Sequence, residues 1–143
     1  MHSVFVLCQN YPSEKDKYSM AFVHPRIKEY LKTGLDVKVI SFACNCSYIY
    51  DEVQVYTLQK GKELLRKSEK VILIAHAPNI KNHLFFILKT WKYLDRLILF
   101  FHGHEVLSTK KYYPRPYDFN KAAKREYRFL RLCDPVSYTH LRA

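Results

Sequence analysis

The chain has 143 residues, a length that is common for a single domain with a hydrophobic core. Its composition, 48% hydrophobic and 26% charged, excludes an intrinsically disordered chain, and its 3 glycines exclude the glycine-rich loops of dinucleotide-binding folds and P-loop enzymes. A formal net charge of +11 favours anionic partners, a class that includes nucleic acid, membrane surfaces and phosphorylated substrates.

Two elements are predicted at the start of the chain. Residues 3–9 form a short apolar run, rich in β-branched side chains, that is typical of a buried strand. Apolar residues then recur every three or four positions from Met20 to Leu31, which predicts a helix. Pro25 is expected to delay the first turn of that helix, and Gly34 is placed to end it.

The next segment is predicted to contain two strands and a short helix or turn. Apolar and polar residues alternate at residues 35–42 and again at residues 52–58, as they do in half-buried strands. The sequence CNCSYIY, residues 44–50, has the composition of a loop. Residues 60–70 are polar and predict a short helix or a turn.

The second half of the chain continues the alternation. Residues 71–75 and 97–101 are continuous apolar runs, which are typical of parallel strands covered on both faces. Asn79 can cap a helix between these two strands, and a further helix is predicted at residues 120–132. The apolar face of the helix after Asn79 would contain Ile80, His83, Leu84, Ile87, Leu88 and Trp91.

Strands that alternate with helices in this order indicate an α/β fold, with a parallel sheet of about five strands and flanking helices. In open parallel sheets, ligands bind beyond the carboxyl ends of the strands. Both continuous apolar strands end at a histidine, His76 in one case and His102 in the other. The sequence therefore predicts a cleft to which both histidines belong.

The last predicted strand is followed directly by His102, Gly103, His104 and Glu105. A catalytic or substrate-contacting cluster is one interpretation, and a structural histidine is the alternative for His102. His102 and His104 would share one side of a continuing strand, which makes a metal site conceivable. Gly103 interrupts that strand and no third ligand has a suitable spacing, so no metal is expected.

Three other features have ordinary structural interpretations beside functional ones. Cys44 and Cys46 lack the spacing of a zinc site and are expected to be free thiols in a reducing cytoplasm. No RNA-binding signature accompanies the aromatic residues, so no nucleic-acid partner is expected. One face of the last predicted helix is basic and would either be solvated or meet anionic lipid or phosphate; its residues are Lys121, Lys124, Arg125 and Arg128.

Three stretches of the sequence together resemble family 4-like glycosyltransferases of the GT-B fold. The opening VFVLCQNYPSEKDKYSMAFVHPRIKEYLKTGLDVKVISF, residues 4–42, resembles their first strand, Tyr-Pro loop, helix and second strand. ILIAHAPN, residues 72–79, resembles their fourth strand, which ends in histidine. LFFHGHEV, residues 99–106, resembles their fifth strand, which ends in His-Gly-x-Asp/Glu. The resemblance extends over about residues 3–133.

This resemblance implies a Rossmann-like N-terminal domain that binds the acceptor, together with a set of site residues. His102 would be the catalytic histidine at the cleft, near the sugar that is transferred. The family requires no metal and no other cofactor. The acceptor side of the cleft and its loop would be formed by His76, Asn79, Gly103, His104 and Glu105.

The activity implied by the resemblance is transfer of a sugar from a nucleotide-sugar donor to a hydroxyl of a glycan or lipid-linked acceptor, in polysaccharide or glycolipid biosynthesis. The enzyme would be cytoplasmic, with peripheral contact at the inner face of an anionic membrane. Residues 11–19 contain no glycine, unlike the first loop of many relatives, which argues against a donor-phosphate role for this loop. A non-enzymatic, basic α/β module that binds anionic surfaces is the alternative.

The resemblance also implies a division of the chain. Residues 1–134 correspond to part of the N-terminal domain of such an enzyme. Residues 135–143, PVSYTHLRA, fall where the next strand is due and resemble translated sequencing-adapter read-through; an ordinary divergent terminus is the alternative. The C-terminal domain that holds the donor in this family has no counterpart in the sequence. A truncated enzyme is therefore expected.

From this division we predict that the 143-residue chain catalyses no sugar transfer by itself. The reaction needs donor and acceptor held in register, and such positioning supplies roughly 7–11 kcal/mol in favourable cases. Incubation of the purified chain with labelled nucleotide sugars and an acceptor panel should therefore yield no labelled product. Clear turnover would show that both substrate sites lie within these residues.

Overall fold

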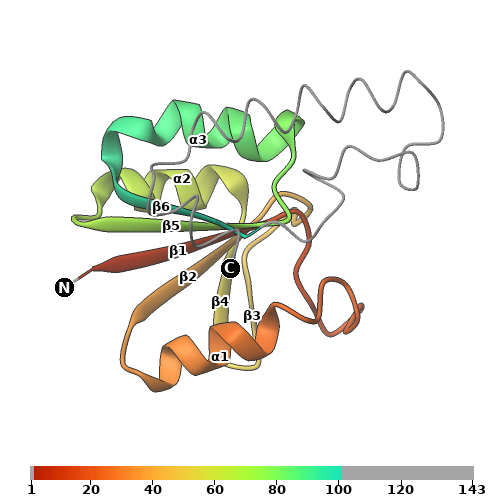
Figure 1. Ribbon diagram of the computed structural model, residues 1–143. Helices are drawn as coiled ribbons and strands as arrows, with labels where there is room; N and C mark the ends of the chain where they lie inside the picture. The colour runs from red at the N-terminus through yellow and green to blue at the C-terminus, as the bar shows by residue number, and fades with distance from the viewer. Residues whose placement is uncertain (1, 101–143) are drawn as a thin grey trace.

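The computed structural model describes residues 2–100, except for the side chains of residues 80 and 81. This part of the chain forms one mixed sheet with helices on both faces (Figure 1). The strands are β1 (Ser3–Cys8), β2 (Asp36–Ser41), β3 (Tyr48–Tyr50), β4 (Val53–Tyr56), β5 (Val71–His76) and β6 (Leu94–Phe100). The helices are α1 (His24–Lys32), α2 (Leu58–Lys67), the π-helical turn η1 (Ile80–Leu84), α3 (Phe85–Thr90) and the 3₁₀ turn η2 (Trp91–Tyr93).

The strand order is β3-β4-β2-β1-β5-β6, and every neighbouring pair is parallel except β3 with β4. The five parallel strands confirm the predicted α/β fold. From β1 the chain first adds β2 and β4 on one side and later adds β5 and β6 on the other. This is the strand order of a Rossmann-like sheet, in which the direction of winding reverses between two central strands. Here the reversal lies between β1 and β5.

The sheet divides the hydrophobic core into two layers, because alternate residues of a strand point to opposite faces. In Figure 1, α1 lies on one face of the sheet and α2 and α3 lie side by side on the other. The layer under α1 contains Val4, Val6, Val39, Ile74 and Ile27 among its buried residues. The layer under α2 and α3 contains Phe5, Leu7, Ile40, Leu65, Leu73 and Ile87.

The first helix begins and ends as the sequence predicts. Pro25 occupies the first turn of α1, where its missing N–H leaves no intrahelical hydrogen bond unmade. Thr33 follows the last helical residue, and Gly34 then adopts a left-handed conformation with φ of 84°. That conformation suits glycine, which has no Cβ to clash with the backbone.

The predicted loop at residues 44–50 is partly wrong, because its last three residues form β3 and pair with β4. Tyr50 pairs with Val53, so the turn between the strands contains only Asp51 and Glu52. These two residues have φ values of 47° and 70°, as the two central residues of a type I′ hairpin turn do. Sequence patterns signal such turns through Asn-Gly or Asp-Gly, and this turn contains no glycine.

The polar segment after β4 is a helix that begins earlier than predicted. α2 starts at Leu58, where the predicted strand at residues 52–58 was expected to end. The side chain of Thr57 accepts a hydrogen bond of 3.2 Å from the Lys60 backbone N–H and so caps the helix.

The predicted apolar face of the helix after Asn79 is also partly wrong. His83, Leu84 and Ile87 are buried as predicted, but Leu88 and Trp91 are exposed, and Phe86 and Thr90 are buried instead. The cause is the π-helical turn η1, in which the Leu84 N–H bonds to the Asn79 carbonyl five residues earlier. An extra residue in one turn rotates every later side chain relative to a regular α-helical pattern.

The helix α2 approaches the sheet closely at Gly61, which is buried against Ile40. A Cβ at this position would overlap the Ile40 side chain. Gly61→Val should therefore lower the free energy of unfolding by about 1–3 kcal/mol, the usual range for overpacking. Urea unfolding of the variant and of Gln59→Val, which alters an exposed position of the same helix, measures the difference. Equal midpoints for the two variants would contradict a tight contact between α2 and β2.

Candidate functional site

The point where the winding of the sheet reverses is the expected place for a ligand in a fold of this kind. β1 and β5 are adjacent and parallel, so their carboxyl ends meet at one edge of the sheet. Gln9 directly follows β1, and Ala77 directly follows β5. The segment that leads into η1 therefore starts beside the loop that leads toward α1.

Three amide side chains meet at this edge. The Gln9 Oε1 accepts hydrogen bonds from the Asn79 Nδ2 at 3.2 Å and from the Asn82 Nδ2 at 2.8 Å. We call Gln9, Asn79 and Asn82 the amide cluster. It links the end of β1 to the start of η1 across the gap between the two central strands. Its members are partly buried and uncharged, and each can both donate and accept hydrogen bonds.

Asn79 confirms its prediction as a helix cap and has a second role. Its Oδ1 accepts hydrogen bonds from the backbone N–H groups of Asn82 at 2.7 Å and His83 at 3.3 Å. These are donors that have no partner within the first turn of a helix. Because its Nδ2 binds Gln9, one side chain both starts the helix and orients the amide cluster.

The chain leaves β5 through a strained residue. Ala77 has a φ of 47°, a left-handed conformation that residues with a Cβ adopt at a cost of order 1–3 kcal/mol. Its backbone N–H donates to the Phe100 carbonyl at 2.9 Å, which ties the turn to the end of β6. Strain of this kind persists where the surrounding structure imposes it, and here it lies at the edge that carries the amide cluster.

His76 is the last residue of β5, as the sequence predicts, but its side chain is only 1% exposed. Its ring is stacked on Phe100, with ring centres 4.9 Å apart and planes inclined by 8°. The Arg26 guanidinium, from α1, lies 4.9 Å from the centre of the same Phe100 ring. His76 is therefore packed in a stack of side chains that come from β5, β6 and α1. The contact of His76 with an acceptor remains a prediction.

The predicted catalytic segment, His102, Gly103, His104 and Glu105, lies outside the residues that the structure describes. The same holds for the basic face at residues 121–128. β6 ends at Phe100 in register with His76, so the carboxyl end of β6 lies at the same edge as the amide cluster. The roles assigned to residues 102–105 remain predictions.

His83 lies buried beneath the amide cluster. Its Nδ1 accepts a hydrogen bond of 3.2 Å from the Asn79 backbone N–H, and its ring meets Phe42 edge to face with centres 4.9 Å apart. Burial lowers the pKa of His83 from its ordinary value of 6.5 to about 4, and the Leu7 carbonyl only partly opposes that shift. The imidazole is therefore neutral at pH 7 and supports the site by packing and hydrogen bonding.

A small polar pocket of about 190 Å³ lies in the loop after β1, next to the amide cluster in sequence. Hydroxyl, amide and carboxylate groups dominate its lining, which includes Asn10, Ser13, Asp16, Ser19, Ser41 and Tyr48. Lys and Arg do not occur in this lining. Such a lining matches ligands that present hydroxyl groups better than ligands that present phosphates.

Two sets of hydrogen bonds hold the pocket wall in place. The Tyr48 hydroxyl donates to the carbonyls of Tyr11 at 3.2 Å and Pro12 at 2.9 Å. The Tyr11 hydroxyl lies 2.6 Å from the His24 Nδ1, and the His24 Nε2 lies 2.9 Å from the Asp51 carboxylate. The bond to His24 and the nearby Lys28 lower the pKa of Asp51. These bonds join the loop to α1 and to the β3–β4 hairpin.

The structure describes three of the four cysteines. Cys8, Cys44 and Cys46 are free thiols, and the Cys44 Sγ donates to the Cys46 carbonyl at 3.4 Å. Burial raises the pKa of Cys8 to about 12, so this thiol is unreactive at neutral pH. Within residues 2–100, no group of three or more His, Cys, Asp or Glu side chains is arranged to hold a metal ion.

Sequence reasoning missed Gln9 and Asn82, although a signal existed for Gln9. The rule that ligands bind beyond the carboxyl ends of parallel strands pointed to His76 and His102, and it applies equally to the first residue after β1. No comparable signal exists for Asn82, because its position beside Gln9 depends on the π-helical turn.

Comparison with models of known protein families, with curated proteins and with solved structures found no match to this chain. Within the described part of the chain, no helix is long and apolar enough to cross a membrane.

The buried His83 should make stability depend on pH. Below its ordinary pKa of 6.5 the unfolded imidazole takes up a proton, whereas the folded one stays neutral until about 4. The unfolded state then binds more protons, so the free energy of unfolding should fall by about 2 kcal/mol between roughly pH 7 and pH 5. His83→Leu should remove this component, which urea unfolding at the two pH values would detect.

Phe42→Leu is the matched control, since it removes the ring that contacts His83 but no titrating group. It should cost similar stability at both pH values. An unchanged pH dependence in His83→Leu would contradict a neutral, buried imidazole.

Proposed function

We propose that this chain is the acceptor-binding, Rossmann-like part of a nucleotide-sugar-dependent glycosyltransferase, and that its acceptor lies between the amide cluster and the polar pocket of the first loop. The single observation that supports this most is the hydrogen-bonding character of that edge, where amide and hydroxyl groups predominate and the pocket lining contains no Lys or Arg. Sugar hydroxyls donate and accept at once, as amide and hydroxyl side chains do.

The location of the amide cluster adds to this support. The carboxyl ends of β1, β5 and β6 share one edge, so a molecule held by Gln9 and Asn82 would extend toward the segment that follows Phe100. His102, the residue proposed to be catalytic, is the second residue of that segment. An acceptor hydroxyl would be oriented there for attack on the anomeric carbon of the donor sugar.

The chemistry of the proposed reaction places few demands on this half of the enzyme. The acceptor oxygen forms a bond to the anomeric carbon, the nucleoside diphosphate leaves with the electrons of the broken bond, and the acceptor proton passes to a base. Holding the acceptor in line with the donor supplies much of the rate enhancement. The nucleotide sugar, a glycan or lipid-linked acceptor and a cytoplasmic location are all parts of the proposal, and no metal is required by it.

Acceptor binding can be tested with the chain itself. Saturation-transfer difference NMR against a panel of oligosaccharides should detect weak binding of one glycan class. Gln9→Ala should weaken that binding about tenfold or more, because the amides of Asn79 and Asn82 lose their shared acceptor and reorient.

Gln54→Ala, which alters an exposed glutamine on β4, is the matched control and should leave glycan binding unchanged. Equal binding by Gln9→Ala and the unaltered chain would remove the amide cluster from the acceptor site. Displacement of the glycan by inorganic phosphate would instead favour an anion-binding function.

A further inference from the structure

The helices α2 and α3 form a second surface of the molecule, and its chemical character differs from that of the polar edge. These helices lie side by side on the face of the sheet opposite α1 (Figure 1). A shallow groove of about 490 Å³ runs along α2. Its lining consists of Leu58, Gln59, Lys62, Glu63, Arg66 and Lys67.

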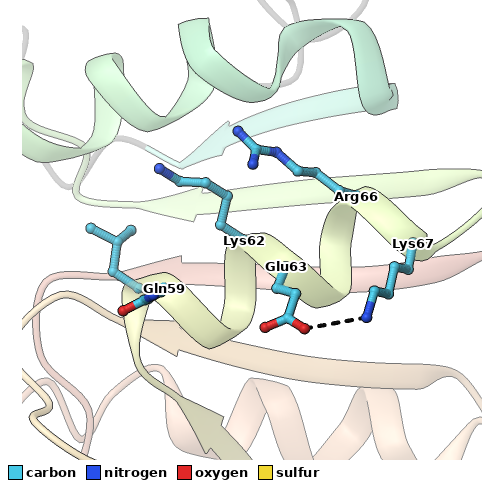
Figure 2. Close-up of a pocket in the computed structure, with 6 residues that line it drawn as sticks. Gln59, Lys62, Glu63, Arg66 and Lys67 are labelled. Carbon is cyan, nitrogen blue, oxygen red and sulfur yellow. Dashed lines mark hydrogen bonds and ion pairs between the residues drawn. The ribbon is translucent and has the colours of Figure 1, made fainter.

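Four cations gather where the two helices face each other. Figure 2 shows Lys62 and Arg66 pointing from α2 toward α3, while Glu63 pairs with Lys67 at 3.2 Å. Arg66 and Lys92 both approach the Tyr93 ring, at 6.0 and 5.2 Å from its centre. Lys89 lies 4.5 Å from the centre of the Phe85 ring. We call Lys62, Arg66, Lys89 and Lys92 the basic cluster.

The basic cluster has no neutralising partner among the residues that the structure describes. The ion pairs found within residues 2–100 involve other cations, and the one carboxylate that lines the groove, Glu63, is bound to Lys67. Partial burial and the positive charges of Lys89 and Arg66 together lower the pKa of Lys62. The four charges therefore repel one another in the free chain, and an anion placed among them would relieve this repulsion.

An exposed apolar stripe lies beside these charges. Phe85, Leu88 and Trp91 follow one another at intervals of three residues along α3 and η2, and they are 59%, 56% and 49% exposed. The exposure of Leu88 and Trp91 follows from the rotation that the π-helical turn imposes on α3. Lys89 and Lys92 come from the same segment, so apolar and cationic side chains alternate along it.

We propose that this face of α2 and α3 binds the surface of an anionic membrane, with Phe85, Leu88 and Trp91 at the headgroup boundary and the basic cluster at lipid phosphates. Exposed aromatic and aliphatic side chains beside Lys and Arg are the composition of interfacial membrane-binding helices. Free phosphate or nucleic acid would match the charges but leave Leu88 without a partner. Membrane contact was expected from the sequence at residues 121–128, whereas this inference concerns α2, α3 and η2 and rests on none of the residues that carry the proposed acceptor site.

Trp91 is the only tryptophan of the chain and is therefore a specific reporter within this surface. Titration of the 143-residue chain with vesicles of equal parts phosphatidylcholine and phosphatidylglycerol should shift its emission to shorter wavelength and reduce quenching by acrylamide. Phosphatidylcholine vesicles alone should do so much less. Added salt should weaken the binding, because it screens the exposed charges.

Charge variants test whether these cations are responsible. Lys89→Gln with Lys92→Gln should weaken vesicle binding by about 25-fold, at roughly fivefold for each basic residue near an anionic surface. The control pair Lys15→Gln with Lys32→Gln makes the same change in net charge at exposed positions around α1 and should have little effect. Leu88→Ser should reduce the emission shift in phosphatidylglycerol vesicles. Circular dichroism verifies that each variant is folded.

Four outcomes would each overturn the proposal. Trp91 could already be protected from acrylamide in the free chain, which would mean that this face is covered. Vesicles could bind without any change in Trp91 emission, which would place the contact elsewhere in the chain. Both double variants could lose affinity equally, which would reduce the effect to net charge. Inorganic phosphate or a single-stranded RNA could produce the same protection of Trp91 as the vesicles, which would identify another kind of ligand.

Discussion

The central position of β1 is the constraint on which the rest of the structure depends. β1 pairs with β2 on one side and with β5 on the other, and its alternate side chains enter both core layers. A strand used in this way has no solvent-facing side, which explains its continuous apolar sequence. Because the chain continues first to one side of β1 and then to the other, the loops after β1 and β5 diverge. The gap between them is where Gln9 meets Asn79 and Asn82.

The two surfaces of interest follow from that arrangement. The edge at the ends of β1 and β5 is polar and nearly neutral, and its groups are already hydrogen-bonded to one another. The face of α2 and α3 is strongly basic and apolar, and the four cations of its basic cluster have no carboxylate partner within residues 2–100. Under the two proposals, one surface would orient a polar ligand and the other would attract an anionic one. A protein that acts on polar molecules at an anionic surface would need both.

The sequence predicts most of the sheet because the buried strands are continuous apolar runs, as at residues 71–75. The β3–β4 hairpin escaped prediction because Asp51 and Glu52 adopt left-handed conformations without the glycine that usually marks them. The buried face of α3 was displaced because periodicity assumes a regular helix, and one π-helical hydrogen bond is not visible in sequence. Within the site, Asn79 was identified as a cap from its local context. The bond between Gln9 and Asn82 joins distant parts of the chain, and local patterns carry no information about such pairs.

The pairing of β1 with β5 also has a consequence for how the chain is made. Ser3 pairs with Val71, so β1 leaves the ribosome long before its second partner has been synthesised. During that interval β1 can pair only with β2, and its other edge remains an apolar strand with unmatched backbone groups. Such edges recruit other chains. Synthesis of β5 is therefore the step that closes the sheet, and a nascent chain that pauses before it should depend on chaperones.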